Sequence, residues 1–152
     1  MLIIDQESKL MAGTITVRDV MVKDVRMVRM DTSVQEVVAT MNKFNIGSII
    51  VMQGERPVGI ITEHDILTRI IEQCLAPQET QAKHIMTTPM ITVQETTSID
   101  EAAKLMAKRK IKKLPVMNGD KLVGILTFTD IAFKVPTLLS ILEEIVRPYR
   151  RV

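Results

Sequence analysis

Val58-Gly59-Ile60-Ile61-Thr62-Glu63-His64-Asp65-Ile66 is a segment that the chain contains in two versions. Sixty-five positions later the sequence reads Val123-Gly124-Ile125-Leu126-Thr127-Phe128-Thr129-Asp130-Ile131. Val, Gly, Ile, Thr, Asp and Ile recur in register. Each version has an apolar run behind a glycine, then a threonine, then an aspartate three positions later. We therefore interpret the chain as two scaffolds that each present one Thr-x-x-Asp step.

The repetition extends over most of the chain at the same spacing. Ser33-Val-Gln-Glu36 and Ser98-Ile-Asp-Glu101 both carry the capping-box signature of a helix N-terminus. Further matching positions are Val20-Met21 with Ile85-Met86, Met41 with Met106, Ile46 with Ile111, Val51-Met52 with Val116-Met117, and Gly54 with Gly119. A fixed spacing without insertions indicates an internal duplication.

Hydrophobic periodicity predicts the elements of one repeat. Apolar residues recur at helical spacing from Val34 to about Asn45, which predicts a helix. The β-branched run that follows predicts a buried strand, and turn residues separate it from a partner strand. The predicted order is two short extended pieces at 15–21 and 25–28, a helix at 34–45, strands at 46–52 and 58–61, and a helix from Thr62 to about Cys74.

The predicted fold class is therefore α+β. A β-α-β-β-α unit of this size buries too little apolar surface alone, so we expect two pseudo-symmetric repeats packed face to face. An amphipathic pattern at 137–146 predicts one further helix. The expected organisation is an N-terminal arm at 1–14, a first repeat at 15–75, a linker at 76–80, a second repeat at 81–134, and a C-terminal helix with a basic tail at 135–152.

Composition excludes several classes of protein. The chain of 152 residues is 46% hydrophobic and 3% aromatic, so an aliphatic core is expected and disorder is not. A formal net charge of +2 does not by itself indicate nucleic acid. The single cysteine excludes an internal disulfide framework. Acids near the N-terminus argue against a signal peptide, and no run reaches the roughly 18 apolar residues of a membrane helix. A cytoplasmic protein without membrane attachment is expected.

The Thr-x-x-Asp step has two interpretations. Threonine followed by an acid three residues later is a variant capping box that stabilises a helix by about 0.5–2 kcal/mol. The second interpretation is nucleotide recognition, because strand-to-helix corners present free N–H groups to anions. A hydroxyl there can hold a phosphate oxygen, and an aspartate can accept hydrogen bonds from a ribose diol. Two copies behind the same glycine favour the second interpretation.

Residues 15–133 resemble the tandem cystathionine-β-synthase (CBS) domains that pair into a Bateman module. The resemblance rests on Met21 and Met86 and on the segments from Gly59 to Asp65 and from Gly124 to Asp130. Lys112-Lys113-Leu114-Pro115-Val116 is similar to the family's basic-basic-Leu-Pro-Val strand. The resemblance implies two clefts between the repeats that bind AMP, ADP, ATP or S-adenosylmethionine.

The same resemblance implies roles for individual residues. Asp65 and Asp130 would hold the two riboses, and Thr62 and Thr127 would meet ribose or phosphate. His64 and Thr129 lie beside them. The residues implied to sandwich or close over the adenines are Ile46 with Ile60, Ile111 with Ile125, and Val25 or Met90 and Ile91.

Basic residues are implied to reach phosphates bound in the opposite cleft. Lys112 and Lys113 are the candidates, and Arg26 is a weaker one. Strand alternation places only one of the two lysines on a given face, and the sequence leaves open which. Gly47-Ser48 occupies the matching place in the first repeat, so the second-repeat ligand lacks that help. One occupied site and two sites of unequal affinity both remain open.

The expected function is a stand-alone regulatory module, an energy sensor that signals its adenosine ligand to a partner protein in trans. Homodimerisation through the second helices, 65–74 and 130–134 onward, is implied by the resemblance. The alternatives are a nucleic-acid-binding module, based on the basic residues between Lys104 and Lys113 and at 147–151, and a ligand-free structural dimer. His64 and His84 lack metal-ligand spacing, and no nucleophile–base pair is recognisable, so no metal, catalytic cofactor or enzyme activity is expected.

Overall fold

The computed structural model describes residues 15–146, so the predicted arm at 1–14 and the basic tail at 147–152 lie outside the described residues. The chain divides into two compact units. Unit 2 is the continuous segment Val25–Ile91, and unit 1 combines the residues up to Asp24 with those from Thr92 onward. Each unit contains one three-stranded sheet.

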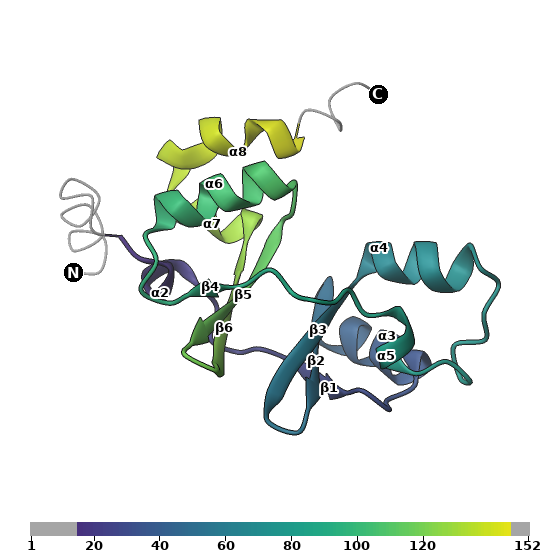
Figure 1. Ribbon diagram of the computed structural model, residues 1–152. Coiled ribbons are helices and arrows are strands. Elements are labelled where there is room, and N and C mark those ends of the chain that lie inside the picture. Colours follow the sequence, from purple (N-terminus) through teal and green to yellow (C-terminus); the bar gives the residue numbers. More distant parts are fainter. Residues whose placement is uncertain (1–14, 147–152) are drawn as a thin grey trace. The chain divides into compact units, whose positions relative to one another are not determined.

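Unit 2 contains the sheet of the first repeat, the helices α3 and α4, and the short helix α5 that follows them in sequence. Its sheet has the order β1-β2-β3, with β1 parallel and β3 antiparallel to the central β2 (Figure 1). Aliphatic side chains of α3 and of the sheet form its core. Its elements are β1 (Met27–Arg29), α3 (Val34–Phe44), β2 (Ser48–Gln53), β3 (Arg56–Thr62), α4 (Glu63–Ile66), a π-helical turn (Leu67–Ile71) and α5 (Ala82–Ile85).

Unit 1 repeats this order around the sheet β4-β5-β6, again with a parallel and an antiparallel neighbour of the central strand. The additional helix α8 packs against α6 (Figure 1). The elements are α2 (Val17–Val20), β4 (Val93–Gln94), α6 (Ile99–Arg109), β5 (Lys113–Asn118), β6 (Lys121–Thr127), α7 (Phe128–Lys134), a 3-10 turn (Pro136–Leu138) and α8 (Leu139–Val146).

The predicted α+β fold, with two β-α-β-β-α repeats and a C-terminal helix, is confirmed. Two local predictions are wrong. Val17–Val20 is a short helix instead of an extended piece, because Asp19 caps its start: the Asp19 carboxylate accepts from the Thr16 N–H at 3.0 Å. The helix expected from Thr62 to Cys74 changes after Ile66 into a π-helical turn that ends at Ile71.

Each of the capping boxes predicted at Ser33 and Ser98 forms only one of its two hydrogen bonds. Each serine hydroxyl accepts the N–H of the glutamate three residues later at 3.2 Å. The glutamate carboxylates return no hydrogen bond to the serine N–H within the described chain. Complete reciprocal boxes occur instead at the two Thr-x-x-Asp steps of the corners and at Thr16 with Asp19.

The short helices α2 and α5 are exchanged between the repeats. Helix α5 opens the second repeat in sequence, yet its Ala82 N–H donates to the Thr32 carbonyl at 2.8 Å in unit 2. Helix α2 opens the first repeat, yet its Val17 N–H donates to the Thr97 carbonyl at 2.8 Å in unit 1. Each unit therefore contains residues of both repeats, and the predicted boundaries at 75 and 81 stay a prediction about the sequence repeats.

An ion pair reinforces the placement of α2. Arg18 Nη2 donates to Glu95 Oε1 at 2.6 Å, and the Arg18 N–H donates to the Glu95 carbonyl at 3.0 Å. The hydrogen bond and positive charge of Arg18 lower the pKa of the Glu95 carboxyl below its usual value, against the desolvation that burial imposes. The corresponding positions in unit 2 are Lys83 and Met30, which share only the backbone hydrogen bond, at 3.0 Å.

Helices α3 and α6 both end at a residue in the left-handed conformation. Asn45 has φ 51° and Lys110 has φ 54°. Asparagine and glycine tolerate this conformation, whereas the Cβ of lysine makes it unfavourable. The second repeat therefore has the less stable helix end.

We predict that Lys110→Gly raises the free energy of unfolding by about 1 kcal/mol. For a chain of this length the thermal midpoint should rise by about 2–4 °C. Lys108→Gly, which changes an exposed residue inside α6, is the matched control and should lower the midpoint. A Lys110→Gly midpoint at or below that of the wild type would contradict the prediction.

The repeated glycines lie where a methionine from an exchanged segment crosses the sheet. A Cβ added at Gly59 would approach the Met86 side chain, with its Sδ at 2.5 Å. A Cβ at Gly124 would approach Met21 Sδ at 2.7 Å and the Val22 carbonyl oxygen at 2.9 Å. Only a side chain must move at Gly59, whereas backbone must move at Gly124.

We predict that Gly124→Ala destabilises the protein by about 1–3 kcal/mol and more than Gly59→Ala does, because overpacking that requires backbone movement is costlier. Chemical denaturation of the two variants measures the difference. Met86→Ala introduced with Gly59→Ala should recover part of the Gly59→Ala loss. Equal losses for the two alanine variants would refute the assignment of the Val22 carbonyl as the obstacle.

Candidate functional site: two strand-to-helix corners

The first Thr-x-x-Asp step forms the corner between β3 and α4. Asp65 Oδ2 accepts the Thr62 N–H at 2.8 Å and the Thr62 hydroxyl at 3.1 Å, and the Asp65 N–H donates to Thr62 Oγ1 at 3.4 Å. The capping interpretation is therefore correct for this step. It uses one carboxylate oxygen and leaves Oδ1 for other partners.

The second step has the same geometry between β6 and α7. Asp130 Oδ2 accepts the Thr127 N–H at 3.2 Å and the Thr127 hydroxyl at 2.8 Å. The Asp130 N–H donates to Thr127 Oγ1 at 3.1 Å. Both corners thus place a threonine and an aspartate at the point where a strand ends and a helix begins.

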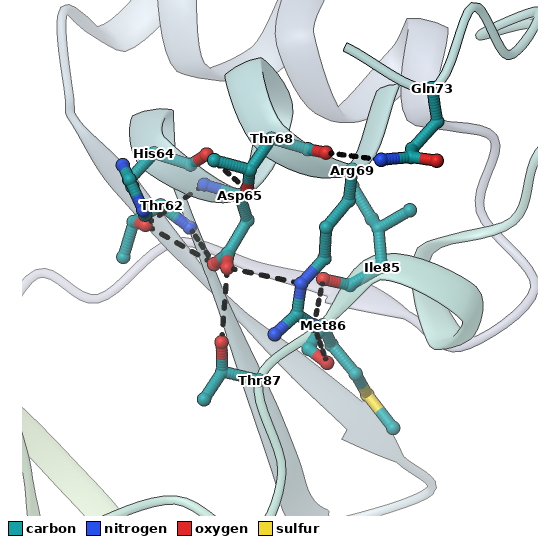
Figure 2. A network of polar contacts seen from close by, with 9 residues as sticks. All are labelled: Thr62, His64, Asp65, Thr68, Arg69, Gln73, Ile85, Met86 and Thr87. Carbon is teal, nitrogen blue, oxygen red and sulfur yellow. Dashed lines mark hydrogen bonds and ion pairs between the residues drawn. The ribbon is translucent and has the colours of Figure 1, made fainter. Parts of the chain in front are cut away.

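The first corner carries two additional contacts, drawn in Figure 2. Asp65 Oδ1 accepts the Thr87 hydroxyl at 3.0 Å and lies 3.7 Å from Arg69 Nε. Arg69 Nη1 also donates to the carbonyls of Ile85 and Met86, at 2.9 and 2.8 Å. Arg69 thus joins the corner to the C-terminal end of α5.

Sequence reasoning did not identify Arg69 or Thr87 as parts of the site. Arg69 lies four residues after Asp65, a spacing at which a helical acid and base are neighbours, so its contact was predictable. Thr87 contacts Asp65 through the exchange of α5, for which the sequence carries no local signal. In unit 2 the Thr87 N–H donates to the Ile60 carbonyl at 2.8 Å, which fixes its position beside β3.

The second corner has different residues at the matching positions. Val22 takes the place of Thr87 and exchanges hydrogen bonds with the Ile125 backbone at 2.9 Å in both directions. Lys134 takes the place of Arg69, and its Nζ donates to the Val20 carbonyl at 2.9 Å. Among residues 15–146, no side chain donates a hydrogen bond to Asp130 Oδ1, and no cation lies within 4.0 Å of this carboxylate.

The residues expected around Asp65 and around Asp130 lie in different units. Unit 2 contains Ile46, Ile60, Thr62 and His64, and unit 1 contains Ile111, Ile125, Thr127 and Thr129. The residues expected to close over the adenines, Val25 or Met90 and Ile91, all lie in unit 2. His64 and Thr129 are exposed, and the two pairs of isoleucines are half-buried. Contacts between these residues and an adenine remain a prediction.

Of Lys112 and Lys113, it is Lys113 that shares a sheet face with the second corner. Lys113 is directly opposite Thr127 in the antiparallel register of β5 and β6, so their side chains share one face. Lys112 precedes β5, and its carbonyl accepts the Phe128 N–H at 2.7 Å. Ser48 holds the place of Lys113 in unit 2, opposite Thr62. The third basic candidate, Arg26, stacks over the Phe44 ring at 3.7 Å.

Neither a metal cluster nor a membrane-spanning helix occurs in the described part of the chain. Among the described residues, no three His, Cys, Asp or Glu side chains are grouped so that they could hold a metal ion. No helix within residues 15–146 is long and apolar enough to cross a membrane.

Comparison with known proteins identifies the family. The model of the CBS domain matches residues 17–72 and 82–136, and the chain belongs to the CBS domain family. CBS-domain proteins are generally regulatory, and their domains generally bind adenosine ligands.

Individual relatives agree with this assignment. An uncharacterized protein of Methanopyrus kandleri is 36% identical over 117 residues, which are 76% of this chain and 60% of that protein. A solved structure of a conserved protein from Pyrococcus horikoshii is 31% identical with a TM-score of 0.75, covering 80% of this chain and 92% of its own. The hexameric CBS-CP12 protein of bloom-forming cyanobacteria has 26% identity and a TM-score of 0.75, covering 83% and 75%. The chain thus spans less than two thirds of the Methanopyrus relative.

Proposed function

We propose that this protein is a regulatory module that binds adenosine nucleotides, AMP, ADP or ATP, or S-adenosylmethionine, and signals the bound state to a partner protein without catalysing a reaction. The observation that supports it is the Thr-x-x-Asp corner, present in both repeats with closely similar capping geometry. The family's general use of adenosine ligands supports the choice of ligand.

The chemistry of each corner suits a nucleoside. A carboxylate accepts two hydrogen bonds from the 2′- and 3′-hydroxyls of ribose without changing its own charge. The positive end of the helix favours an anionic phosphate, while the threonine hydroxyl donates to the aspartate and completes the cap. The isoleucines on the neighbouring strand, Ile60 and Ile125, offer apolar surface to the adenine ring.

Lys113 is our candidate for the basic residue nearest to a bound phosphate. It shares a sheet face with Thr127, and it is half-buried whereas Lys112 is exposed. Its positive charge would lie beside the second corner, and this differs from the sequence expectation that the lysine serves the ligand of the opposite cleft. Ser48 at the matching place in unit 2 supplies no charge there.

We predict that AMP, ATP or S-adenosylmethionine raises the thermal midpoint of the full chain. Ligand at 100 times its dissociation constant stabilises by about 2.7 kcal/mol, which is several degrees at this chain length. The double variant Asp65→Asn with Asp130→Asn should lose the shift, because charged hydrogen bonds contribute about 1.5–3 kcal/mol each.

Asp120→Asn with Asp100→Asn is the matched control. It changes the same charge at two exposed positions outside the corners and should keep the shift. No shift with any of these ligands, combined with salt-sensitive binding of a polynucleotide, would replace this proposal with the nucleic-acid alternative. No binding of either kind would favour the ligand-free structural dimer.

We also propose that the module forms a homodimer through the second helix of unit 2. Leu67 and Ile71 lie one turn apart on the π-helical turn and are 60% and 63% exposed. Large apolar side chains exposed side by side are typical of a contact surface. The cyanobacterial CBS-CP12 relative is a hexamer, which supports self-association in this family.

We predict that Leu67→Glu with Ile71→Glu reduces the molar mass measured by light scattering, with little loss of monomer stability, because both side chains are exposed. Glu72→Leu, an exposed change next to this surface, is the control and should preserve the assembly. A molar mass that the double variant leaves unchanged would place the contact elsewhere.

A further inference from the structure

The two corners differ in what their aspartates already bind. We infer that Asp130 is the ribose-binding carboxylate of this protein, whereas Asp65 has a structural role in holding the segment after α5 against the first corner. The inference rests on the proposed function and specifies which corner serves it. Its basis is the pair of contacts that Asp65 makes and Asp130 lacks.

Asp65 has little capacity left to accept hydrogen bonds. An ionised carboxylate offers about four lone-pair directions, two on each oxygen. The Thr62 N–H and hydroxyl engage Oδ2, at 2.8 and 3.1 Å. The Thr87 hydroxyl engages Oδ1 at 3.0 Å, and Arg69 Nε lies 3.7 Å from the same oxygen. Asp65 is also buried, with 5% of its surface exposed.

Asp130 retains an open oxygen. Its cap uses only Oδ2, through Thr127. Within the described chain, Oδ1 accepts no hydrogen bond and no Arg, Lys or His nitrogen lies within 4.0 Å of it. Asp130 is half-buried, so it is more accessible than Asp65. A ribose diol can therefore bind there without displacing a protein group.

One residue accounts for most of the difference. Thr87 lies beside β3, and Val22 lies at the matching place beside β6. Thr87 exchanges backbone hydrogen bonds with Ile60, and Val22 does so with Ile125. A threonine there donates a hydroxyl to the aspartate, and a valine of nearly the same shape cannot. A nucleoside at Asp65 must first displace Thr87, whereas a nucleoside at Asp130 meets no such competitor.

The basic residues Arg69 and Lys134 add to the difference between the two aspartates. Arg69 has a forked side chain and serves both Asp65 and the end of α5 through its separate nitrogens. Lys134 has a single nitrogen, and that nitrogen donates to the Val20 carbonyl. The first repeat therefore places a cation beside its own aspartate, whereas the matching cation of the second repeat binds a backbone carbonyl.

The test is calorimetric titration of the full chain with AMP and with ATP. We expect one tight site per chain, with any second site weaker by about ten- to a hundredfold. Asp130→Asn should weaken the tight site at least about tenfold more than Asp65→Asn does. A larger effect of Asp65→Asn, or two sites of equal affinity, would overturn the inference while leaving nucleotide binding established.

Two near-isosteric substitutions test the assignment without removing either carboxylate. Thr87→Val should strengthen binding at the first corner so that a second site appears in the titration. Val22→Thr should weaken the tight site, because the new hydroxyl competes for Asp130 Oδ1. Thr88→Val, at the exposed neighbouring position, is the control and should not create a second site. The opposite pattern for Thr87→Val and Val22→Thr would overturn the inference.

Thermal unfolding of the ligand-free variants tests the structural role of Asp65 separately. Asp65→Asn and Thr87→Val should each lower the midpoint, and their combination should lower it by less than the sum, because they remove one hydrogen bond. Additive losses would overturn the structural role. If neither AMP nor ATP binds the wild type, the proposed function and the ribose role of Asp130 are both wrong. The thermal midpoints of the ligand-free variants still test the structural role of Asp65.

Discussion

Each sheet depends on a short helix supplied by the other repeat. The N–H groups that start α2 and α5 donate to carbonyls in the segments that precede α6 and α3, at 2.8 Å in both units. Buried backbone groups need such partners, so neither repeat is complete by itself. The crossing methionines, the glycines beneath them and the cations that bind the helix ends are all positioned by this exchange.

The exchange also governs the chemistry of the corners. Capping and ligand binding first look like competing uses of one aspartate, but the geometry separates them. The cap engages Oδ2 and makes the orientation of the side chain independent of any ligand. What happens to Oδ1 is then decided by the residue that the exchanged segment places beside it. A corner can therefore keep its structure while its capacity to bind changes.

The repeat, the order of elements and the helix starts were predictable, because they are recorded in local spacing and composition. The helix at Val34–Phe44 and the two strands after it follow directly from periodicity. The helical form of Val17–Val20 was missed because four residues are too few for a period to show. Thr87 was missed for a different reason, since it lies 22 positions from Asp65 and reaches it only through tertiary structure. Lys113 could be assigned a face only once the register with Thr127 was known.

The discontinuity of unit 1 has a consequence for the synthesis of the protein on the ribosome. Synthesis proceeds from the N-terminus, and domains generally fold in the order in which they emerge. Here α2 emerges early, but its partners Glu95 and Thr97 are made only after the whole of Val25–Ile91. The continuous unit can therefore be finished while the discontinuous one still waits for β5, β6 and α6. The nascent chain must keep α2 unpaired until Glu95 and Thr97 have emerged, so the discontinuous unit folds after the continuous one.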